Sequence, residues 1–405
     1  MSARWKFSNL MFISIAVALF FVVGMGSAWA VFAQIRPATL ADLIEGAKKE
    51  TVLKGQWSSS GFGGSLGLEK IAKGMNKQYG FKIKTQFTPG PNMQRMMGKL
   101  AREVAAGQPA SSDVYFGNPQ GLLYAQKNNV LKSYDWVSIL ERPLPSEPGF
   151  SSVAPGGIGV VFATTLVGLI YNSDLIKGDN IPKRLSDVLK PKWKGRIAST
   201  PYAAGMREFA MPDVLGREAV FDFTRKLSKQ ISGLMRCGEM DRITSGEFLM
   251  LVLACGESNV NMARRRGMPL GYALLQDAIV AHTRYAGVPK NSAAPNAAAL
   301  LIAYLHTPEG QKLLWDLDGL DLHLISRIEP KEKSRQGTSQ WSEGSRKLAA
   351  VAWFSQALQA DAEGASKDPG KRRREGEEEK IGSVVGLISS AWKGPGTFHA
   401  ALFHP

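Results

Sequence analysis

Residues 81–119, FKIKTQFTPGPNMQRMMGKLAREVAAGQPASSDVYFGNP, place a strand, an amphipathic helix and a second strand in succession. Alternating apolar residues predict the first strand from Phe81 to Phe87. Apolar residues at helical spacing predict a helix from Met93 to Val104, and a short strand follows at 113–117. Because strands separated by helices pair in parallel, this stretch predicts a parallel, doubly wound sheet with helices on both faces.

The same alternation continues on both sides. It predicts a helix at 40–47, a strand at 51–57, a helix at 68–79 that ends at Gly80, and a helix at 122–127 after the turn Asn118-Pro119. The loop 143–157, with four Pro and three Gly, then interrupts the order and predicts a crossover.

A second set of elements follows the crossover. Strands are predicted at 160–162, 166–171, 196–199, 249–255 and 270–275, and helices at 185–189, 220–231 and 258–266. Two further helices begin at Pro295 and Pro308, since Pro is favoured in the first turn of a helix. This set predicts a second α/β lobe.

Composition narrows the classes of protein that fit. The 405 residues are 44% hydrophobic and 21% charged, which excludes a wholly disordered chain, and the one long apolar run lies near the N-terminus. The formal net charge is +15, and such a surplus attracts anionic solutes or nucleic acid, or only maintains solubility. The export signal described next argues against nucleic acid, and the sequence contains no zinc-finger spacing.

The N-terminus has the three parts of a secretory signal peptide. Arg4 and Lys6 precede an apolar run from Leu10 to Val23, and small residues flank Trp29. We expect cleavage after Ala30, or else after Ala33, and export to the periplasm. An uncleaved anchor is the alternative, but the apolar run is short for a bilayer-spanning helix.

Six segments together resemble the type II solute-binding proteins of ABC importers, in the branch that includes ferric-ion, thiamine and polyamine binders. They are LADLIEGAKKETVL (40–53), RMMGKLAREVAAG (95–107), LIYNSDL (169–175), PKWKGRI (191–197), SGE (245–247) and PNAAALLIAYLHTPEGQ (295–311). The resemblance implies two doubly wound α/β lobes joined by hinge strands, a ligand cleft between them, and delivery of the ligand to an ABC transporter permease.

The resemblance and the element order together suggest domain limits. We expect a signal peptide at 1–30, one lobe from 31–157 and 278–325, a second lobe from 158–277 and 326–363, and a poorly ordered tail at 364–405. The hinge is expected near 158–165 and 272–280. Within the tail, the apolar stretch 381–392 is alternatively a short helix.

Polar residues follow the predicted strands at four points. In open α/β sheets, ligands bind beyond the carboxyl ends of the strands, so these residues are candidate ligand-binding groups. They are Ser58, Ser59, Ser60, Asn118, Ser199, Thr200, Tyr202 and Asp277. Hydroxyls, amides and one carboxylate suit reversible capture of a small polar solute, and none is an activated nucleophile. The same side chains also serve as helix caps or turn residues.

The sequence predicts neither a metal site nor a cofactor. Iron binders of this branch resemble one another in an adjacent Tyr pair, and the corresponding stretch here, 255–260, has Ser258 and Asn259. His282, His306 and His323 do not fall at metal-ligand spacing. The Gly-rich stretch 61–67 has Leu66 where a dinucleotide fingerprint requires Gly. An exported enzyme or sensor on the same fold is the alternative function.

The basic lobes and the hydroxyl-rich loops favour an anionic or zwitterionic solute, and Asp277 offers a partner for an amine. We expect a monomer.

The two cysteines, Cys237 and Cys255, both belong to the predicted second lobe. They either form a disulfide in the oxidising periplasm or remain buried thiols, and their spacing does not decide between these states.

Overall fold

The structure is a computed structural model that describes residues 38–58, 61–91, 93–140, 144, 146–147, 150–201, 204–210, 214–277 and 280–320. All of the described elements belong to one compact unit that begins at Thr39. The predicted leader, the 326–363 segment and the tail lie outside the described residues, as do Ser59, Ser60 and Tyr202. Among the described residues, no helix is long and apolar enough to cross a membrane.

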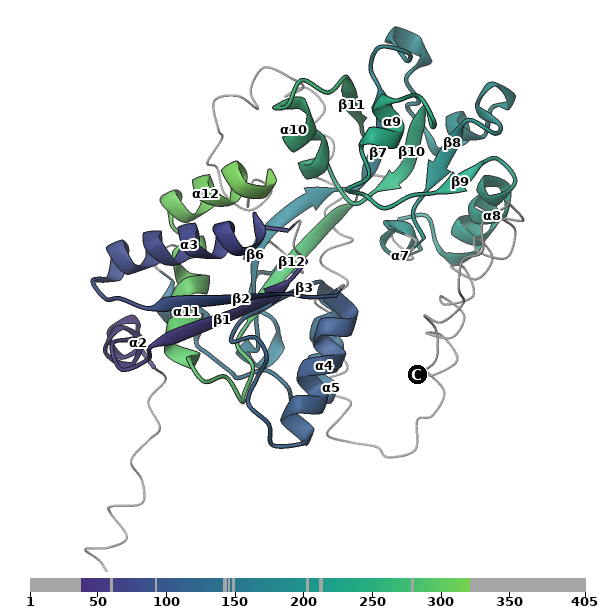
Figure 1. The fold of residues 1–405 in the computed structure, drawn as a ribbon. Helices are drawn as coiled ribbons and strands as arrows, with labels where there is room; N and C mark the ends of the chain where they lie inside the picture. The colour runs from purple at the N-terminus through teal and green to yellow at the C-terminus, as the bar shows by residue number, and fades with distance from the viewer. Residues whose placement is uncertain are drawn as a thin grey trace, which may run out of the picture. The chain divides into compact units, whose positions relative to one another are not determined.

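The first lobe is built around five strands in the order β2-β1-β3-β12-β6 (Figure 1). They are β1 (Val52–Trp57), β2 (Lys84–Pro89), β3 (Tyr115–Gly117), β6 (Val160–Leu166) and β12 (Ala281–Gly287). β1 and β2 pair in parallel, and a parallel bridge between Gly55 and Val114 joins β1 to the segment leading into β3. β12 runs antiparallel to both β3 and β6.

Helices cover this first sheet and bury its apolar residues. They are α2 (Leu40–Ala47), α3 (Gly64–Tyr79), α4 (Met93–Ala105), α5 (Pro119–Lys127), α6 (Trp136–Ile139), α11 (Pro295–Leu305) and α12 (Pro308–Asp318). Every residue of α11 from Ala297 to Leu305 is buried, because α2, α3 and α12 all pack against it. This helix is therefore the centre of the first lobe's core.

The second lobe repeats the strand arrangement of the first. Its order is β9-β8-β10-β7-β11, with β7 (Gly168–Asn172), β8 (Ile197–Ser199), β9 (Gly233–Leu234), β10 (Met250–Ala254) and β11 (Leu270–Ala273). β8 is parallel to β9 and β10, whereas β7 is antiparallel to β10 and β11. In each lobe, the fourth strand of this order, β12 or β7, is therefore antiparallel to both of its neighbours.

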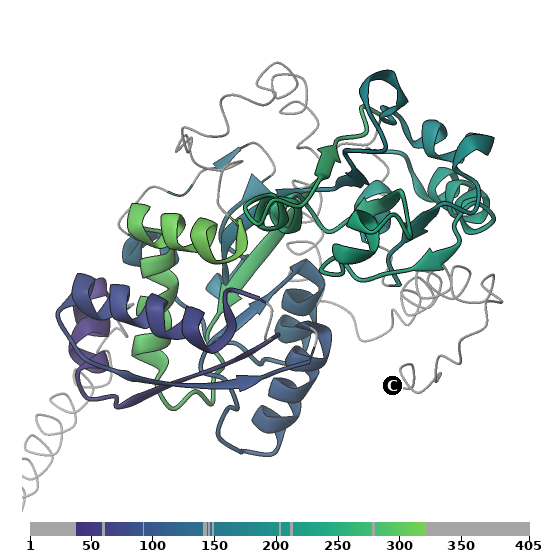
Figure 2. The same cartoon turned by 45° about the horizontal axis from the view of Figure 1, so that its top comes forward.

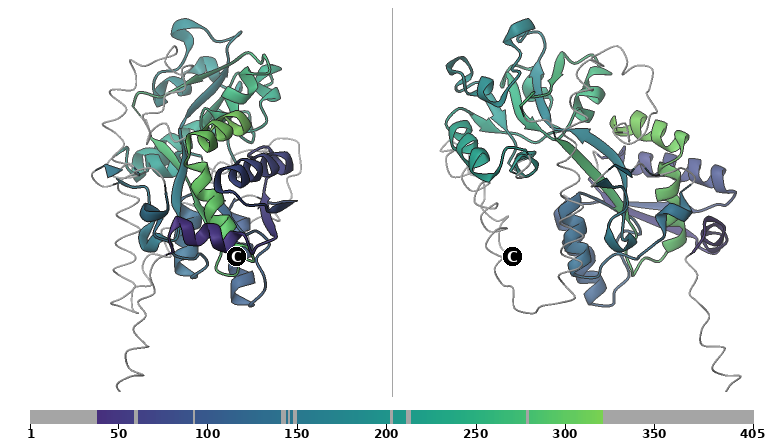
Figure 3. Two further views of the ribbon diagram at one scale, coloured as in Figure 1. Left: turned by 90° about the vertical axis from the view of Figure 1, so that its left-hand side faces the viewer. Right: turned by 180° about the vertical axis from the view of Figure 1, so that it is seen from behind.

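Short helices complete the second lobe. They are α7 (Met206–Phe209), α8 (Arg217–Ser228), α9 (Asp241–Thr244) and α10 (Ser258–Arg264), with 3-10 turns η2 (Gly178–Asn180), η3 (Leu185–Leu189) and η4 (Pro191–Trp193). Three short elements precede β6 in the sequence: the strands β4 (Ser146–Glu147) and β5 (Phe150–Ser151) and the 3-10 turn η1 (Pro155–Gly157). Figures 2 and 3 show the teal elements of this lobe gathered around their own sheet.

Two strand connections pass between the lobes. Only Val167 separates β6 from β7, and β11 leads back to β12. At this point the connections bond to each other, since the Val167 amide donates to the Val280 carbonyl at 3.0 Å. The return connection, which includes Val280, lies in the predicted hinge segment 272–280, whereas Val167 lies two residues beyond the predicted segment 158–165.

The predicted parallel pairing is confirmed for β1, β2 and the segment leading into β3, but it does not extend across either whole sheet. β7 and β12 enter their sheets directly from the opposite lobe, without the helical crossover that returns a strand to parallel pairing. Both sheets are therefore mixed, although the two-lobed α/β class predicted from the sequence is confirmed.

Local differences from the predicted elements have local causes. The strand expected from Phe81 begins at Lys84, because the Asn76 side chain bonds both backbone groups of Ile83 at 3.3 Å and holds the preceding residues against the end of α3. Gly80 ends α3 in the left-handed region, as predicted, with φ of 70°. Cys237 and Cys255 form a disulfide, with Cα atoms 6.0 Å apart.

Candidate functional site

The first candidate loop follows β1. Ser58 is exposed, and its carbonyl accepts a hydrogen bond from the Gly61 amide at 2.9 Å. The chain then turns through Phe62 and Gly63, both in the left-handed region, into α3. Gly63 is the N-cap residue and has no side chain with which to cap, and the first turn of α3 contains no acidic residue. The helix therefore begins without a side-chain anion against its amide groups.

The Phe62 side chain anchors this loop in the core of the first lobe. Its ring lies within 6 Å, centroid to centroid, of the rings of Trp57, Phe116 and Phe162. The Phe62 amide bonds the carboxylate of Asp318 at the end of α12. Burial raises the pKa of Asp318 to about 6, while nearby Arg284 and the Phe62 amide act in the opposite direction. An aromatic cluster and a buried carboxylate thus hold the loop.

Asn118 follows β3 and is nearly buried, with 7% of its surface exposed. Its side-chain oxygen accepts from the Gly121 amide at 3.0 Å, which makes it the N-cap of α5. Its side-chain oxygen is thus engaged in the cap, which is the structural role that the sequence left open for it.

In the second lobe, Ser199 and Thr200 end β8 and are fully buried. The Ser199 hydroxyl donates to the Val252 carbonyl at 3.3 Å, so it links β8 to β10. The Thr200 hydroxyl accepts from the Ala204 amide at 3.1 Å and closes the turn that leads to α7. Both hydroxyls have backbone partners within their own lobe.

Asp277 lies on the return segment after β11. Its two carboxylate oxygens accept from the Leu185 amide at 3.0 and 3.2 Å. The carboxylate thus fastens the start of η3 to the return segment. Asp277 therefore caps η3, a turn that lies far earlier in the sequence.

The sequence analysis missed the junction between β6 and the start of α10. The Glu257 carboxylate accepts from the Leu166 amide at 3.0 Å, and the Thr165 hydroxyl donates to the Cys255 carbonyl at 3.1 Å. Between these residues, Gly256 has φ of 134°, and a Cβ there would lie 2.4 Å from Thr165 Cβ. The signal in the sequence is the Cys-Gly-Glu step between an apolar strand and a helix.

The structure groups the candidate residues by lobe. Ser58 and Asn118 follow β1 and β3, which are neighbours through the Gly55–Val114 bridge. Ser199 is the last residue of β8 and Thr200 follows it, and the parallel neighbour β10 leads to the Glu257 junction. Each group therefore lies beyond the carboxyl ends of adjacent parallel strands, the usual ligand position in open α/β sheets.

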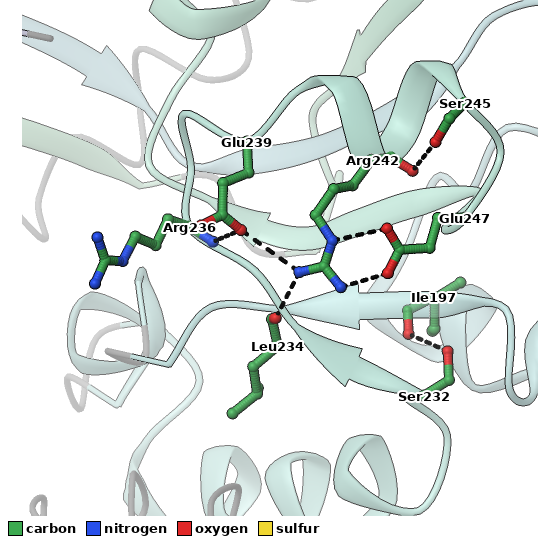
Figure 4. Close-up of polar contacts among 8 residues, drawn as sticks. All are labelled: Ile197, Ser232, Leu234, Arg236, Glu239, Arg242, Ser245 and Glu247. Carbon is green, nitrogen blue, oxygen red and sulfur yellow. Dashed lines mark hydrogen bonds and ion pairs between the residues drawn. The ribbon is translucent and has the colours of Figure 1, made fainter. Parts of the chain in front are cut away.

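An Arg242 cluster elsewhere in the second lobe serves the fold (Figure 4). Its guanidinium forms a two-pronged contact with Glu247, with Nε 2.8 Å from Oε2, and donates to the Leu234 carbonyl at 3.1 Å. Glu239 is 3.5 Å away. These partners raise the pKa of Arg242 and lower that of Glu247. Arg242 therefore ties α9 to β9, and Glu247 holds its guanidinium in place.

Within the described residues, no group of three or more His, Cys, Asp or Glu side chains is placed to hold a metal ion. His306 is buried in the core, with its ring nitrogens 2.8 and 2.9 Å from the carbonyls of Ile302 and Val161. Burial lowers its pKa. Ser258, at the position of the missing Tyr pair, is buried at the start of α10. His323 lies outside the described residues.

Comparisons with known proteins agree with this architecture. A family model described as bacterial extracellular solute-binding protein matches residues 70–321, more than half of the chain. No curated protein sequence matches the chain.

Solved structures share the fold at low sequence identity. Iron-bound HitA from Pseudomonas aeruginosa is 17% identical, with a TM-score of 0.56 over 77% of this chain and 99% of that one. AfuA from Actinobacillus pleuropneumoniae, solved with fructose-6-phosphate, is 17% identical, with a TM-score of 0.53 over 76% and 99%. The spermidine/putrescine-binding PotD from Streptococcus pneumoniae is 11% identical, with a TM-score of 0.54 over 84% and 99%.

Proposed function

The chain belongs to the family of bacterial extracellular solute-binding proteins, and from this premise we propose that it captures a small polar solute between its lobes for an ABC importer. The observation that carries the proposal is the repeated sheet, in which polar loops follow adjacent parallel strands of both lobes. Two strand connections that meet at Val167 and Val280 supply the hinge. Binding of this kind leaves the solute chemically unchanged.

The solute that fits best carries an anionic or oxygen-rich group. The start of α3 has no capping side chain and no acidic residue in its first turn, so its amide groups favour negative charge, although the Asp318 carboxylate already bonds the Phe62 amide just before the helix. Asp277, the candidate partner for an amine, already accepts from the Leu185 amide. A zwitterion remains compatible, since a carboxylate can accept more than one hydrogen bond. The AfuA likeness is consistent with an organic phosphate.

The predicted leader supports export to the periplasm, and we propose that the protein acts there as a monomer. Arg4, Lys6 and the apolar run to Val23 support export, and mass analysis of the exported N-terminus tests cleavage after Ala30. An intact Met1 on the exported protein would contradict this part of the proposal.

A thermal-shift screen tests solute capture. The exported protein, unfolded and refolded to remove co-purified solute, is screened against phosphonates, sugar phosphates, carboxylates, polyamines, thiamine and ferric complexes. A solute at 100 times its dissociation constant should add about 2.7 kcal/mol to the free energy of unfolding. Mass spectrometry of the solute afterwards separates a binder from an enzyme, because a binder returns it unaltered.

Thr200→Ala tests whether the second-lobe loop takes part. The variant loses the hydroxyl that closes the turn at Ala204, so we expect the solute-induced shift to fall by about half or more. Thr224→Ala is the matched control, since Thr224 is equally buried but its hydroxyl bonds the Val220 carbonyl within α8 and contacts the Met206 sulfur on α7, away from the strand ends. Both variants should lose intrinsic stability, by about 1–2 kcal/mol, but Thr224→Ala should retain the shift. Equal retention in both variants would remove this loop from the site.

A further inference from the structure

The second lobe carries a basic surface outside the candidate site. We call it the basic face, and it consists of six exposed cations: Lys190, Lys192, Lys194, Arg225, Lys226 and Lys229. The first three lie on and beside η4, and the other three lie at the end of α8. Part of the net positive charge of the chain is therefore concentrated on two segments of one lobe.

Gln230 makes these two segments one continuous surface. Its buried side-chain amide donates to the Lys190 carbonyl at 2.7 Å and to the Val188 carbonyl at 3.3 Å. Its backbone carbonyl accepts from the Gly195 amide at 2.9 Å. The end of α8 and the η3–η4 segment are thus bonded to each other, so their cations stay side by side.

Carboxylates neutralise only part of this charge. Lys190 pairs with Asp187 at 2.7 Å, and Lys226 pairs with Asp222 at 2.6 Å. Among the described residues, the other four cations of the basic face form no ion pair. Lys192 bonds the Asn180 side chain at 2.8 Å and lies over the Trp193 ring, contacts that fix the side chain and leave its charge intact.

We propose that the basic face holds the protein against a membrane surface rich in anionic phospholipid. The six side chains are all exposed and come from two segments, so they suit a broad anionic surface better than a single phosphate. Five of the six are lysines, which act as point charges on flexible stems. Lysines near such a surface each contribute to binding, and their attraction extends about one Debye length, roughly 8–10 Å. This role goes beyond solute capture, because it would keep the exported protein near the membrane.

Vesicle binding tests this proposal. The exported protein is sedimented with phosphatidylcholine vesicles that contain phosphatidylglycerol, and with vesicles of phosphatidylcholine alone. We expect binding only to the anionic vesicles, weakened by salt. The triple variant Lys192→Gln, Lys194→Gln and Lys229→Gln should bind about a hundredfold more weakly, since each lysine contributes about fivefold.

The matched control removes the same charge from the first lobe. Lys70→Gln, Lys73→Gln and Lys77→Gln neutralise three exposed lysines of α3, and binding should change by less than about threefold. Replacing Lys192, Lys194 and Lys229 by Arg should preserve binding, because the charge remains. Equal losses in both Gln variants would show that only net charge matters and would overturn the proposal.

Three further outcomes would also overturn it. Binding to phosphatidylcholine alone, insensitive to salt, would show that charge is not the cause. If the basic-face variant loses binding to polyglutamate but not to anionic vesicles, the surface serves an acidic protein instead of a lipid. Absence of any vesicle binding by the unaltered protein would likewise contradict the proposal.

Discussion

Asp318 is a titratable residue that contacts the candidate loop between β1 and α3. It ends α12, its carboxylate bonds the Phe62 amide, and Arg284 on β12 lies close enough to act on its pKa. Burial nevertheless dominates and raises that pKa from 3.8 to about 6. The folded protein therefore binds a proton at Asp318 more tightly than the unfolded chain does.

This shift predicts how stability depends on pH. Because the folded pKa is raised, the contribution of Asp318 to the free energy of unfolding is full below about pH 4 and is lost as pH rises through about 6. Asp318→Asn is neutral at every pH, so at pH 7 it should be more stable than the unaltered protein, by about 1–3 kcal/mol. The difference should shrink toward pH 4, as measured by urea unfolding at pH 7, 5 and 4.

Asp316→Asn provides the control for this prediction. Asp316 lies on the same helix but is exposed and paired with Lys312, so its replacement should change stability by no more than about 1 kcal/mol. A stability difference for Asp318→Asn that stays constant between pH 4 and 7 would mean that Asp318 does not titrate in this range.

At the scale of elements, the turn from β10 to α10 depends on Gly256. Its φ of 134° is a conformation that residues with a side chain rarely adopt, and a Cβ there would meet Thr165 on β6. Gly256→Ala should therefore lower the free energy of unfolding by about 2–4 kcal/mol, through strain and displacement of the crossing strand.

Gly267→Ala separates the backbone strain from the contact with Thr165. Both glycine variants are measured by urea unfolding. Gly267 has φ of 79°, but a Cβ there would meet no atom within 4 Å. This variant should lose only about 1 kcal/mol. If Gly256→Ala loses no more than Gly267→Ala, the contact between Gly256 and β6 is not tight.

Helices were the elements that could be predicted best from the sequence. The apolar spacing from Met93 to Val104 placed α4 within one residue, and Gly80 marked the end of α3. In contrast, β12 was not predicted, because its sequence AHTRYAG alternates between residues of mixed polarity and has no apolar face. Its position depends on pairing with β3 and β6, more than a hundred residues earlier in the chain.

The sequence predicted the loop positions of the candidate residues but not the contacts that their side chains make. Strand ends placed Asn118, Thr200 and Asp277 correctly in loops, yet each side chain bonds a backbone amide in its own lobe. Caps and ligand contacts use the same side chains, so spacing alone cannot separate them. Glu257 escaped prediction because its partner, the Leu166 amide, is 91 residues away.

At the scale of the whole molecule, the lobes also meet through α10 and α12. Arg265 donates to the Trp315 carbonyl at 2.9 Å, and its guanidinium lies 4.8 Å from the centre of the Trp315 ring. The two strand connections that bond at Val167 and Val280 leave only a few connecting residues to change conformation, and the Arg265–Trp315 contact must adjust when they do. We therefore expect each lobe to move as a rigid body when a solute binds.

Small-angle X-ray scattering tests the central claim of solute capture between the lobes most directly. The exported protein is measured alone and at saturation with the solute that gives the largest thermal shift in the screen. We expect the radius of gyration to decrease on binding, because the lobes close about the hinge. An unchanged radius of gyration at saturation would contradict capture by closure of the two lobes.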